Sequence, residues 1–290
     1  MLLAIKSKQT GLSFIELLIG MVIGIVILGG ILTVYMAGKR SYSDGEQLAM
    51  MDESARHAID ILKRHLEHAG YASVTGIPVP DYVLTPNTPI IGASVNSYNN
   101  VKTSLDGTGN SSDIVGIRFK ADSRVYTDCT ENELKVNLIC TGLSANEVCE
   151  SDKVLSATDS LIYNSFVVKT NDTEKNTIGE KIPLLSCHSS LGSSSVVVQG
   201  IENMQVNYGV DTNNDKVADR YLTATQIETE GLWGNIISIQ IALLVRSRDP
   251  FYSNAKSETF TLLDKTLPAF NDRYRRAVYT TTIRLRNLEG

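Results

Sequence analysis

The apolar positions along the chain divide it into an apolar helix, an amphipathic helix and a region of strands. Residues 12–37 form an apolar run of 26 residues in which Glu16 is the one charged side chain. As an α-helix, this run would be about 39 Å long, which is enough to cross a bilayer. The pattern therefore predicts a single membrane-spanning helix.

The helical periodicity continues beyond the apolar run, with apolar residues three and four positions apart. These residues form one stripe that reaches to about His68, and Gly70 follows as a stop signal. The stripe consists of Leu48, Met51, Ala55, Ala58, Ile59, Leu62, Leu66 and Ala69. We expect it to pack on the chain's own globular domain, without a partner protein.

Six later segments are rich in β-branched residues, and several alternate with a period of two. They are residues 113–121, 160–169, 194–200, 201–210, 236–247 and 277–287. Between helix and strands, residues 71–112 contain four prolines and runs of Asn, Ser and Gly, which predict loops. The pattern as a whole predicts an α+β fold in which an antiparallel β-sheet packs on the C-terminal half of a long N-terminal helix.

Composition and charge narrow the function classes. The 290 residues are 42% hydrophobic and carry a net charge of −5, which permits one or two packed domains and argues against a general nucleic-acid binder. Lys6 and Lys8 precede the apolar run without an acidic residue, and such positive flanks stay in the cytoplasm. The part of the chain after the helix is then expected outside the cytoplasm. The helix continues well beyond the apolar region of a signal peptide, so we expect it to be retained in the mature protein.

All four cysteines lie in the part expected outside the cytoplasm: Cys129, Cys140, Cys149 and Cys187. An oxidising compartment favours two disulfides over free thiols, and three pairings are possible. A CxxC-like spacing for a metal is missing. His188 beside Cys187 raises the alternative of an activated thiol, but we favour a structural cysteine.

Glu16 places a carboxylate where hydrocarbon is expected, and such a charge costs roughly 2.5 kcal/mol or more unless it is compensated. In one explanation the carboxylate reaches the headgroups near the end of its helix. In the other it pairs with a positive group. The surrounding residues favour pairing.

The stretch "GLSFIE" (11–16) resembles the processing site of type IV prepilins and of type II secretion pseudopilins. In that family a peptidase cuts after the glycine and methylates the new terminal amine, and the glutamate becomes the fifth residue. The resemblance implies cleavage between Gly11 and Leu12, N-methylation of Leu12, and a role for Glu16 in assembly. Its carboxylate would be compensated by the terminal amine of an adjacent subunit. Phenylalanine is commoner than Leu12 at the new terminus.

Three further segments resemble PilW-type minor pilins: "SARHAIDILKRHLEHAGY" (54–71), "VQGIENMQVNYGVDTNNDKVADRY" (198–221) and "YRRAVYTTTIRLRN" (274–287). The last is shared in looser form with the J-type pseudopilin. The resemblance implies a type IV pilin-like fold in four parts. These are a cleaved leader (1–11), a transmembrane and filament-core half of the helix (12–38), an amphipathic half (39–70) and a periplasmic β-rich domain (71–290). Residues 72–110 and 122–160 match nothing in this family.

The implied function is that of a minor pilin, which joins other minor pilins in a tip or priming complex that initiates type IV pilus assembly. Twitching motility, adhesion or DNA uptake would depend on it. Expected partners are other minor pilins, the major pilin, the prepilin peptidase, the assembly platform and a tip adhesin. The protein is expected in the inner membrane and then at the pilus tip. The alternatives are a J-type minor pseudopilin of type II secretion, or a single-span periplasmic binding or adhesion protein that never polymerises.

One loop has the spacing of a calcium site, in which oxygens converge from alternate positions. The candidate ligands are Asp211, Asn213, Asp215, the Val217 carbonyl and Asp219. Lys216 replaces the usual glycine, and Leu222 stands where a bidentate Glu would close the site. Two explanations remain open: one structural calcium ion, or a polar hairpin loop capped by its own side chains.

Catalytic motifs are missing from the sequence, which contains no phosphate loop, nucleophile elbow or HExxH. His65 and His68 have a spacing that could hold a metal on one helix face, but we favour solvated histidines, as for His57. The arginine cluster at 273–276 is expected to be a solvated strand flank and not a contact for DNA or an acidic partner. The sequence therefore predicts no enzyme.

Overall fold

A computed structural model describes residues 13–71, 82–85, 103–120, 127–132, 161–190 and 194–287, without the side chains of 171 and 172. The chain forms two compact units, Met1–Leu48 and Ala49–Gly290. One α-helix, α1 (Phe14–Leu66), contributes residues to both. It is also the one helix of the described chain that is long and apolar enough to cross a membrane.

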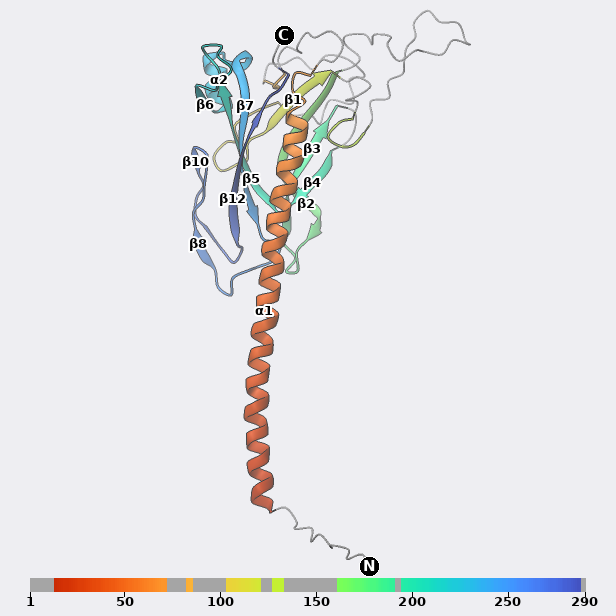
Figure 1. The fold of residues 1–290 in the computed structure, drawn as a ribbon, viewed down its shortest axis with the longest axis vertical. Helices are drawn as coiled ribbons and strands as arrows, with labels where there is room; N and C mark the ends of the chain where they lie inside the picture. The colour runs from red at the N-terminus through yellow and green to blue at the C-terminus, as the bar shows by residue number, and fades with distance from the viewer. Residues whose placement is uncertain are drawn as a thin grey trace, which may run out of the picture. The chain divides into compact units, whose positions relative to one another are not determined.

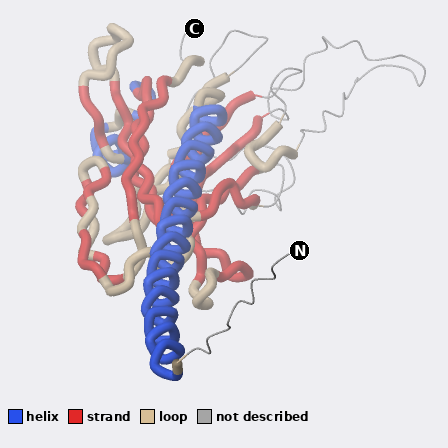
Figure 2. The backbone as a smooth tube through the Cα atoms, turned by 60° about the horizontal axis from the view of Figure 1, so that its bottom comes forward, coloured by secondary structure: helices blue, strands red, loops and turns tan. Residues whose placement is uncertain are grey.

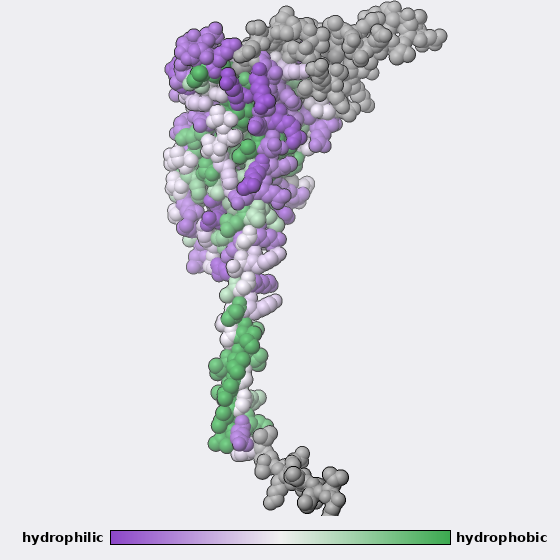
Figure 3. Space-filling view, in the orientation of Figure 1, coloured by the Kyte–Doolittle hydropathy of each residue, from purple (hydrophilic) through white to green (hydrophobic). Residues whose placement is uncertain are grey.

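The part of α1 in the first unit carries its apolar side chains on the outside. Ile25 is 63% exposed and Val34 is 74% exposed, and the residues between them are similar. Figure 3 shows this apolar surface along the lower part of the helix. Gly20 and Gly24 have open space where a Cβ would stand, so no contact within the described chain requires their small size.

The part of α1 in the second unit buries one stripe of side chains. Met51, Ala55, Ala58, Leu62 and Leu66 are all buried, and Ala69 follows in the turn after the helix. The stripe predicted from the sequence is thus confirmed from Met51 onward. Its first member, Leu48, is exposed.

The end of α1 is fixed by the rest of the domain. Gly70 has a left-handed φ of 75°, and its amide donates to the carbonyl of Arg118 over 3.0 Å. A Cβ at this position would lie 3.3 Å from the carbonyl oxygen of Asn287, so both conformation and space favour glycine. The Asn287 side chain in turn donates to the carbonyls of Glu67 and Ala69.

Two antiparallel four-stranded sheets make up most of the second unit (Figures 1 and 2). The first has the order β1-β2-β3-β4 and the second the order β12-β7-β5-β6. The strands of the first are β1 (Val115–Lys120), β2 (Leu161–Lys175), β3 (Lys181–Ser189) and β4 (Ser195–Gln199). Those of the second are β5 (Ile201–Val210), β6 (Arg220–Leu222), β7 (Ile236–Arg246) and β12 (Arg276–Arg284).

Smaller elements complete the described chain. They are α2 (Ala224–Glu230), the 3-10 turn η2 (Trp233–Asn235), the strand pair β8 (Lys256–Glu258) and β11 (Phe270–Asp272), and the pair β9 (Thr261–Leu262) and β10 (Lys265–Thr266). The segment from β8 to β11 packs on β7, where Leu262 and Leu267 contact Ala242 and Leu244.

One hydrophobic core joins the buried stripe of α1 to both sheets. Along β7, which lies in the strand predicted over 236–247, Ile239, Ile241 and Leu243 face this core at alternate positions, whereas Ile237 is half-buried. Ala242 and Leu244 point to the opposite face, which the β8–β11 segment covers. β7 is therefore buried on both faces. The α+β class with a long helix packed on antiparallel strands is confirmed.

The structure adds elements that the sequence did not predict. β3 was missed because Pro183 stands inside it, and proline cannot donate to a ladder. Pro183 nevertheless accepts a hydrogen bond from the Gly200 amide over 2.7 Å. The helix α2 is only seven residues long, too short for a periodic signal, although Thr223 and Gln226 form a capping box at its start.

Candidate assembly site

Glu16 lies in the first turn of α1 and turns its carboxylate back to the start of the helix. The Ser13 amide donates to this carboxylate over 2.9 Å, and the Ser13 carbonyl accepts from the Glu16 and Leu17 amides. The backbone–carboxylate contact is one half of a capping box, and an acidic group is favourable at this positive helix end. The carboxylate thus has a local partner within its own chain.

The position of this carboxylate is relevant to processing. If the chain is cut after Gly11, the new terminal amine belongs to Leu12, the residue before Ser13. Gly11 and Leu12 lie outside the described residues, so cleavage and methylation stay predictions. The carboxylate of Glu16 nevertheless stands at the helix end from which a terminal amine would emerge.

The cysteines form one disulfide in the described chain, between Cys129 and Cys187, with a Cα–Cα distance of 6.1 Å. Cys187 is buried in β3, and Cys129 contacts the same core. The alternative of an activated Cys187 thiol is wrong, because this sulfur is bonded. Cys140 and Cys149 lie outside the described residues, so their pairing is a prediction.

The histidines of α1 have two environments. His57 is exposed, as expected. His65 and His68 pack against Phe166 and Phe119, with ring centroids 6.0 Å and 5.6 Å apart. Burial lowers the pKa of both, to about 4 for His65, where the nearby His68 adds to the effect. Both rings are therefore neutral at pH 7, and the expectation of solvated, charged histidines is wrong for this pair.

The candidate calcium loop connects β5 and β6, and its polar side chains largely bind its own backbone. The buried Asp211 carboxylate accepts from the amides of Asn213, Asn214 and Lys216. Asp219 accepts from the amide and the hydroxyl of Thr212. These hydrogen bonds lower the pKa of the exposed Asp219 carboxyl.

The remaining loop ligands follow the same pattern. Asp215 accepts from the Val217 amide over 2.8 Å and from the Asn213 side chain over 3.1 Å. Lys216 adopts a φ of 65°, the conformation for which calcium loops use glycine. Among the described residues, no three His, Cys, Asp or Glu side chains gather in a way that could hold a metal. The geometry is that of a self-capped loop, and calcium remains a prediction.

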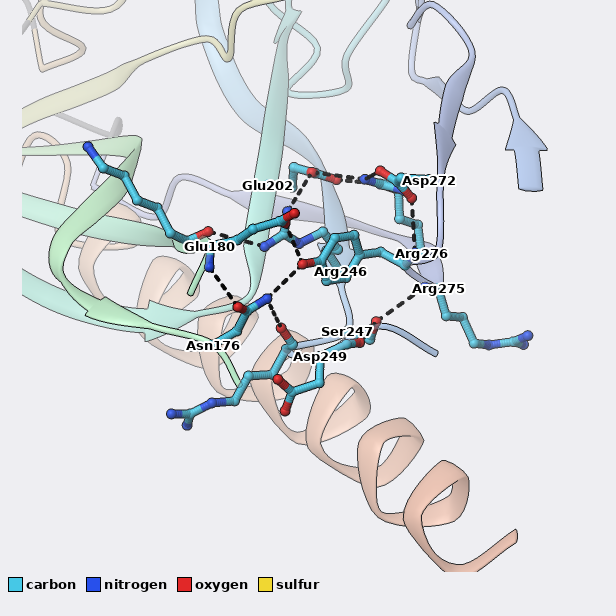
Figure 4. Close-up of polar contacts among 12 residues, drawn as sticks. Asn176, Glu180, Glu202, Arg246, Ser247, Asp249, Asp272, Arg275 and Arg276 are labelled. Carbon is cyan, nitrogen blue, oxygen red and sulfur yellow. Dashed lines mark hydrogen bonds and ion pairs between the residues drawn. The ribbon is translucent and has the colours of Figure 1, made fainter. Parts of the chain in front are cut away.

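A buried ionic network, which the sequence did not reveal, joins both sheets (Figure 4). The Arg276 side chain is 2% exposed and binds the carboxylates of Glu202 and Asp272. Burial opposes the charge of Arg276, but hydrogen bonds to Asp272 and Glu202 outweigh it and raise the pKa. Glu202 also pairs with Arg246 at 3.5 Å. β5, β7 and β12 are thereby connected.

Tyr274 extends the network to the turn between β2 and β3. The guanidinium of Arg246 lies 4.0 Å from the centroid of the Tyr274 ring. The Tyr274 hydroxyl donates to Glu180 and accepts from the Asn176 side chain. Burial, followed by the hydrogen bond to Glu180, raises the pKa of Tyr274 to about 12. No local motif could predict these contacts, because the partners are about 100 positions apart in the chain.

The arginine cluster therefore has mixed roles. Arg273 and Arg275 are exposed, as expected of a strand flank, and Arg275 lies over the Phe251 ring at 5.5 Å. Arg276 is buried, and for this residue the expectation of a solvated flank is wrong. The reason is that two carboxylates compensate its charge inside the domain.

Comparison with known proteins supports the resemblance seen in the sequence. The family model of type IV pilus-assembly protein W matches residues 165–287, which include two of the three PilW-like segments. A solved structure of a type IV-like pilin from Thermus thermophilus matches with 12% identity and a TM-score of 0.37, over 85% of this chain and 97% of that one. A comparison with curated protein sequences found no match.

The matched region runs from β2 to the end of β12 and includes most of both sheets and the ionic network. The N-terminal features are independent of this match, because they lie outside it: one apolar helix able to span a membrane, and Glu16 in its first turn. The α+β fold agrees with the one that the resemblance implies, and residues 165–287 are similar to the family of type IV pilus-assembly protein W.

Proposed function

We propose that this protein is a minor pilin, which is inserted in the inner membrane by α1, carries its second unit in the periplasm, and is then incorporated at the tip of a type IV pilus. The family match supports this role. The observation that carries the proposal is the contrast along α1, where the apolar side chains before residue 48 are exposed and those from Met51 onward are buried or half-buried. Exposed apolar surface of this extent requires a membrane or neighbouring helices.

The mechanism follows from one helix that serves two surroundings. In the membrane, the apolar part of α1 anchors the subunit. In the filament, the same surface packs on the helices of other pilins, and the small residues Gly20, Gly24, Gly29 and Gly30 allow close approach. Together with other minor pilins, the protein forms the complex that primes polymerisation.

Two other functions remain as alternatives. A J-type pseudopilin would use the same helix in a secretion pseudopilus, but the family model that matches is that of the pilus protein. A single-span protein that never polymerises would need the apolar helix only as an anchor. In that protein Glu16 would have no role beyond capping its own helix.

The first experiment is to read the mature N-terminus by mass spectrometry in pili sheared from native cells. An N-methylated Leu12 in the pilus fraction is the expected result, since it reports processing and incorporation together. An intact Met1, or a chain confined to the inner membrane of normally piliated cells, would contradict the proposal.

A matched pair of substitutions tests the role of the carboxylate. Glu16→Ala is expected to be inserted in the membrane at the normal level but to be lost from the pilus fraction, because the charge that sets its register is missing. Glu46→Ala removes an exposed carboxylate from the same helix and should be incorporated like the wild type. Equal incorporation of the two variants would favour the non-polymerising anchor.

A further inference from the structure

Positive and aromatic side chains gather at one end of the second unit, where β7 ends and β12 begins. The two segments stay paired beyond these strands, because the Ser247 amide donates to the Arg275 carbonyl over 2.8 Å. The amides of Phe251 and Tyr252 both donate to the carbonyl of Arg273, over 2.8 Å and 2.9 Å. We call this surface the basic end, and it consists of Arg248, Phe251, Tyr252, Lys256, Arg273 and Arg275.

The aromatic and positive side chains of the basic end contact one another. The rings of Phe251 and Tyr252 meet edge to face, with centroids 5.2 Å apart. The guanidinium of Arg275 lies 5.5 Å from the centroid of the Phe251 ring. The amine of Lys256 lies 5.1 Å from the centroid of the Tyr252 ring. Each ring thus has a cation over it.

Three arginines of the basic end have no partner of opposite charge within the described chain. Arg248, Arg273 and Arg275 are exposed, and none of them makes an ion pair with a described residue. Lys256, in contrast, pairs with Glu258. The basic end therefore presents positive charge on the outside of a chain whose net charge is −5.

The carboxylates that neighbour these arginines in the sequence are bound by other groups. Asp249 accepts from the amide and the hydroxyl of Thr177, and Asp272 binds Arg276. In Figure 4, Asp272 and Arg276 meet in the buried network, while the side chain of Arg275 points away from it. An anionic partner for the exposed arginines has to come from outside the chain.

The basic end is the end of the second unit at which α1 leaves it. β12 and α1 run in the same direction, because Tyr279 binds Asp52 and Asn287 binds the carbonyl of Glu67. Arg275 precedes Tyr279 along this direction, so it lies towards the residues with which the unit begins (Figure 1).

The chain itself holds this end close to a membrane in which α1 is inserted. The apolar run ends at Ala37 and the second unit begins at Ala49, and the helical residues between them rise by only about 18 Å. Tyr35 and Tyr42, which are 68% and 76% exposed, flank the end of the run, as aromatic residues do at a headgroup layer. Anionic headgroups are therefore the anionic surface that the tether brings nearest to the basic end.

The mixture of rings and cations also fits a headgroup layer. Aromatic rings settle at the level of the headgroups, and Lys and Arg bind the phosphates of anionic lipids. DNA offers phosphates as well, but the chain holds no DNA near this end, whereas α1 would hold the membrane there. The observations thus favour lipid over nucleic acid.

We propose that the basic end binds the phosphates of anionic phospholipids on the periplasmic face of the inner membrane, with Phe251 and Tyr252 at the level of the headgroups. The contact keeps the second unit on the membrane until the subunit enters the filament. The proposal rests on one part of the proposed function, the insertion of α1, and it adds a second membrane contact made by the β-rich domain.

Photocrosslinking in vesicles tests this contact. The full chain carries a photoreactive aromatic residue in place of Tyr252 and is reconstituted in vesicles of three parts phosphatidylethanolamine and one part phosphatidylglycerol. The control carries the same residue in place of Tyr221, a 40% exposed tyrosine of β6 at the opposite end of the second sheet. We expect a phosphatidylglycerol adduct, identified by mass spectrometry, from position 252 and not from 221. Equal adducts from both positions, or none from 252, would overturn the proposal.

Matched substitutions test the role of the charge in the chain that carries the photoreactive residue at 252. Arg275→Gln should lower the yield of the phosphatidylglycerol adduct by up to about fivefold, the effect of one basic residue at an anionic surface. Arg284→Gln removes an exposed arginine at the far end of β12 and should leave the yield unchanged. Urea unfolding checks that both variants fold. An unchanged yield in Arg275→Gln and in Arg273→Gln would contradict the proposal.

Two further outcomes separate this proposal from its alternatives. If duplex DNA is added to the vesicles and position 252 crosslinks to it in place of the lipid, the basic end is a nucleic-acid contact and the proposal fails. If the wild type is absent from sheared pili but position 252 crosslinks to the lipid, the membrane contact stands and the pilus-tip function fails. Incorporation in pili without a lipid adduct in vesicles would leave the function and remove the contact.

Discussion

The two parts of α1 are helical for different reasons. Residues 14–37 are apolar around the whole helix apart from Glu16, and they are exposed, so no packing within the described chain buries their side chains. Residues 49–66 are amphipathic, and Ala55, Ala58 and Leu62 are fully buried by the chain's own sheets. The apolar side chains of the first part therefore need a membrane or other subunits to bury them, whereas those of the second part are buried by the same chain.

This difference teaches where sequence changes should matter. A substitution in the buried part alters the stability of the folded domain, whereas one in the exposed part alters only contacts with a membrane or other subunits. The ionic network adds to the stability of the second unit, because Tyr274 connects it to the turn between β2 and β3 in the other sheet. Stability and assembly are thus expected to be separable along a single helix.

The strongest test of this separation compares two leucines. Leu62→Ala should lower the free energy of unfolding by about 2–5 kcal/mol, because it leaves a cavity in the core. Leu28→Ala removes the same atoms from a side chain that is 61% exposed and should change the stability of the domain very little. Urea unfolding of the full chain in detergent micelles measures both. A comparable loss for Leu28→Ala would break the comparison.

The dependence of folding stability on pH also distinguishes the two parts of α1, because the histidines that cause it lie in the buried part. His65 has a pKa of about 4, below the usual 6.5, because burial disfavours its charged form. Between these values the unfolded chain binds more protons, so stability falls as the pH drops from 6.5 towards 4, by up to about 3 kcal/mol. The lowered pKa of His68 acts in the same direction.

Asp113 acts in the opposite direction over the same range. Burial raises its pKa from 3.8 to about 6, so the folded chain binds more protons and gains stability as the pH falls from 6 to 3.8. We therefore expect His65→Gln to lose less stability than the wild type between pH 7 and pH 5. Asp113→Asn should lose more. Urea unfolding at the two pH values checks both, and identical losses in all three proteins would contradict the assigned burial.

Calcium should have the smallest effect on stability among these tests, and this effect should be confined to the second unit. If the loop at 211–219 binds the ion with the affinity of extracellular modules, millimolar calcium adds about 1 kcal/mol and raises the Tm by about 2–4 °C. Asp215→Asn should abolish this shift while magnesium leaves the wild type unchanged. A wild-type Tm that is insensitive to calcium would leave the self-capped loop as the explanation.

Local patterns predicted the elements that depend on local chemistry. The apolar run, the stripe from Met51 to Ala69 and six strands follow from composition and periodicity, which a single segment displays. The short α2 and the proline-containing β3 were missed, since their sequences give no periodic signal or contradict it.

The contacts that were missed depend on residues far apart in the chain. From the sequence alone, Arg276 was predicted to be a surface arginine. In the structure, Glu202 and Asp272 bind its buried side chain. His65 reads as solvated until Phe166 covers it. Glu16 was singled out from the sequence as a charge in need of a partner; its contact with the Ser13 amide is a local one, and its role in assembly stays a prediction.

The hydrogen bonds from Asn287 to the end of α1 also bear on how the chain folds during synthesis. The helix is made first, yet the strand that precedes Asn287 and the side chain that covers the helix end are made last. The core therefore cannot close until almost the whole chain has left the ribosome, and its contacts span the full length of the domain, which slows folding. Until then the apolar stripe of α1 lacks part of the surface that covers it in the folded domain, which includes Ile283 and Leu285.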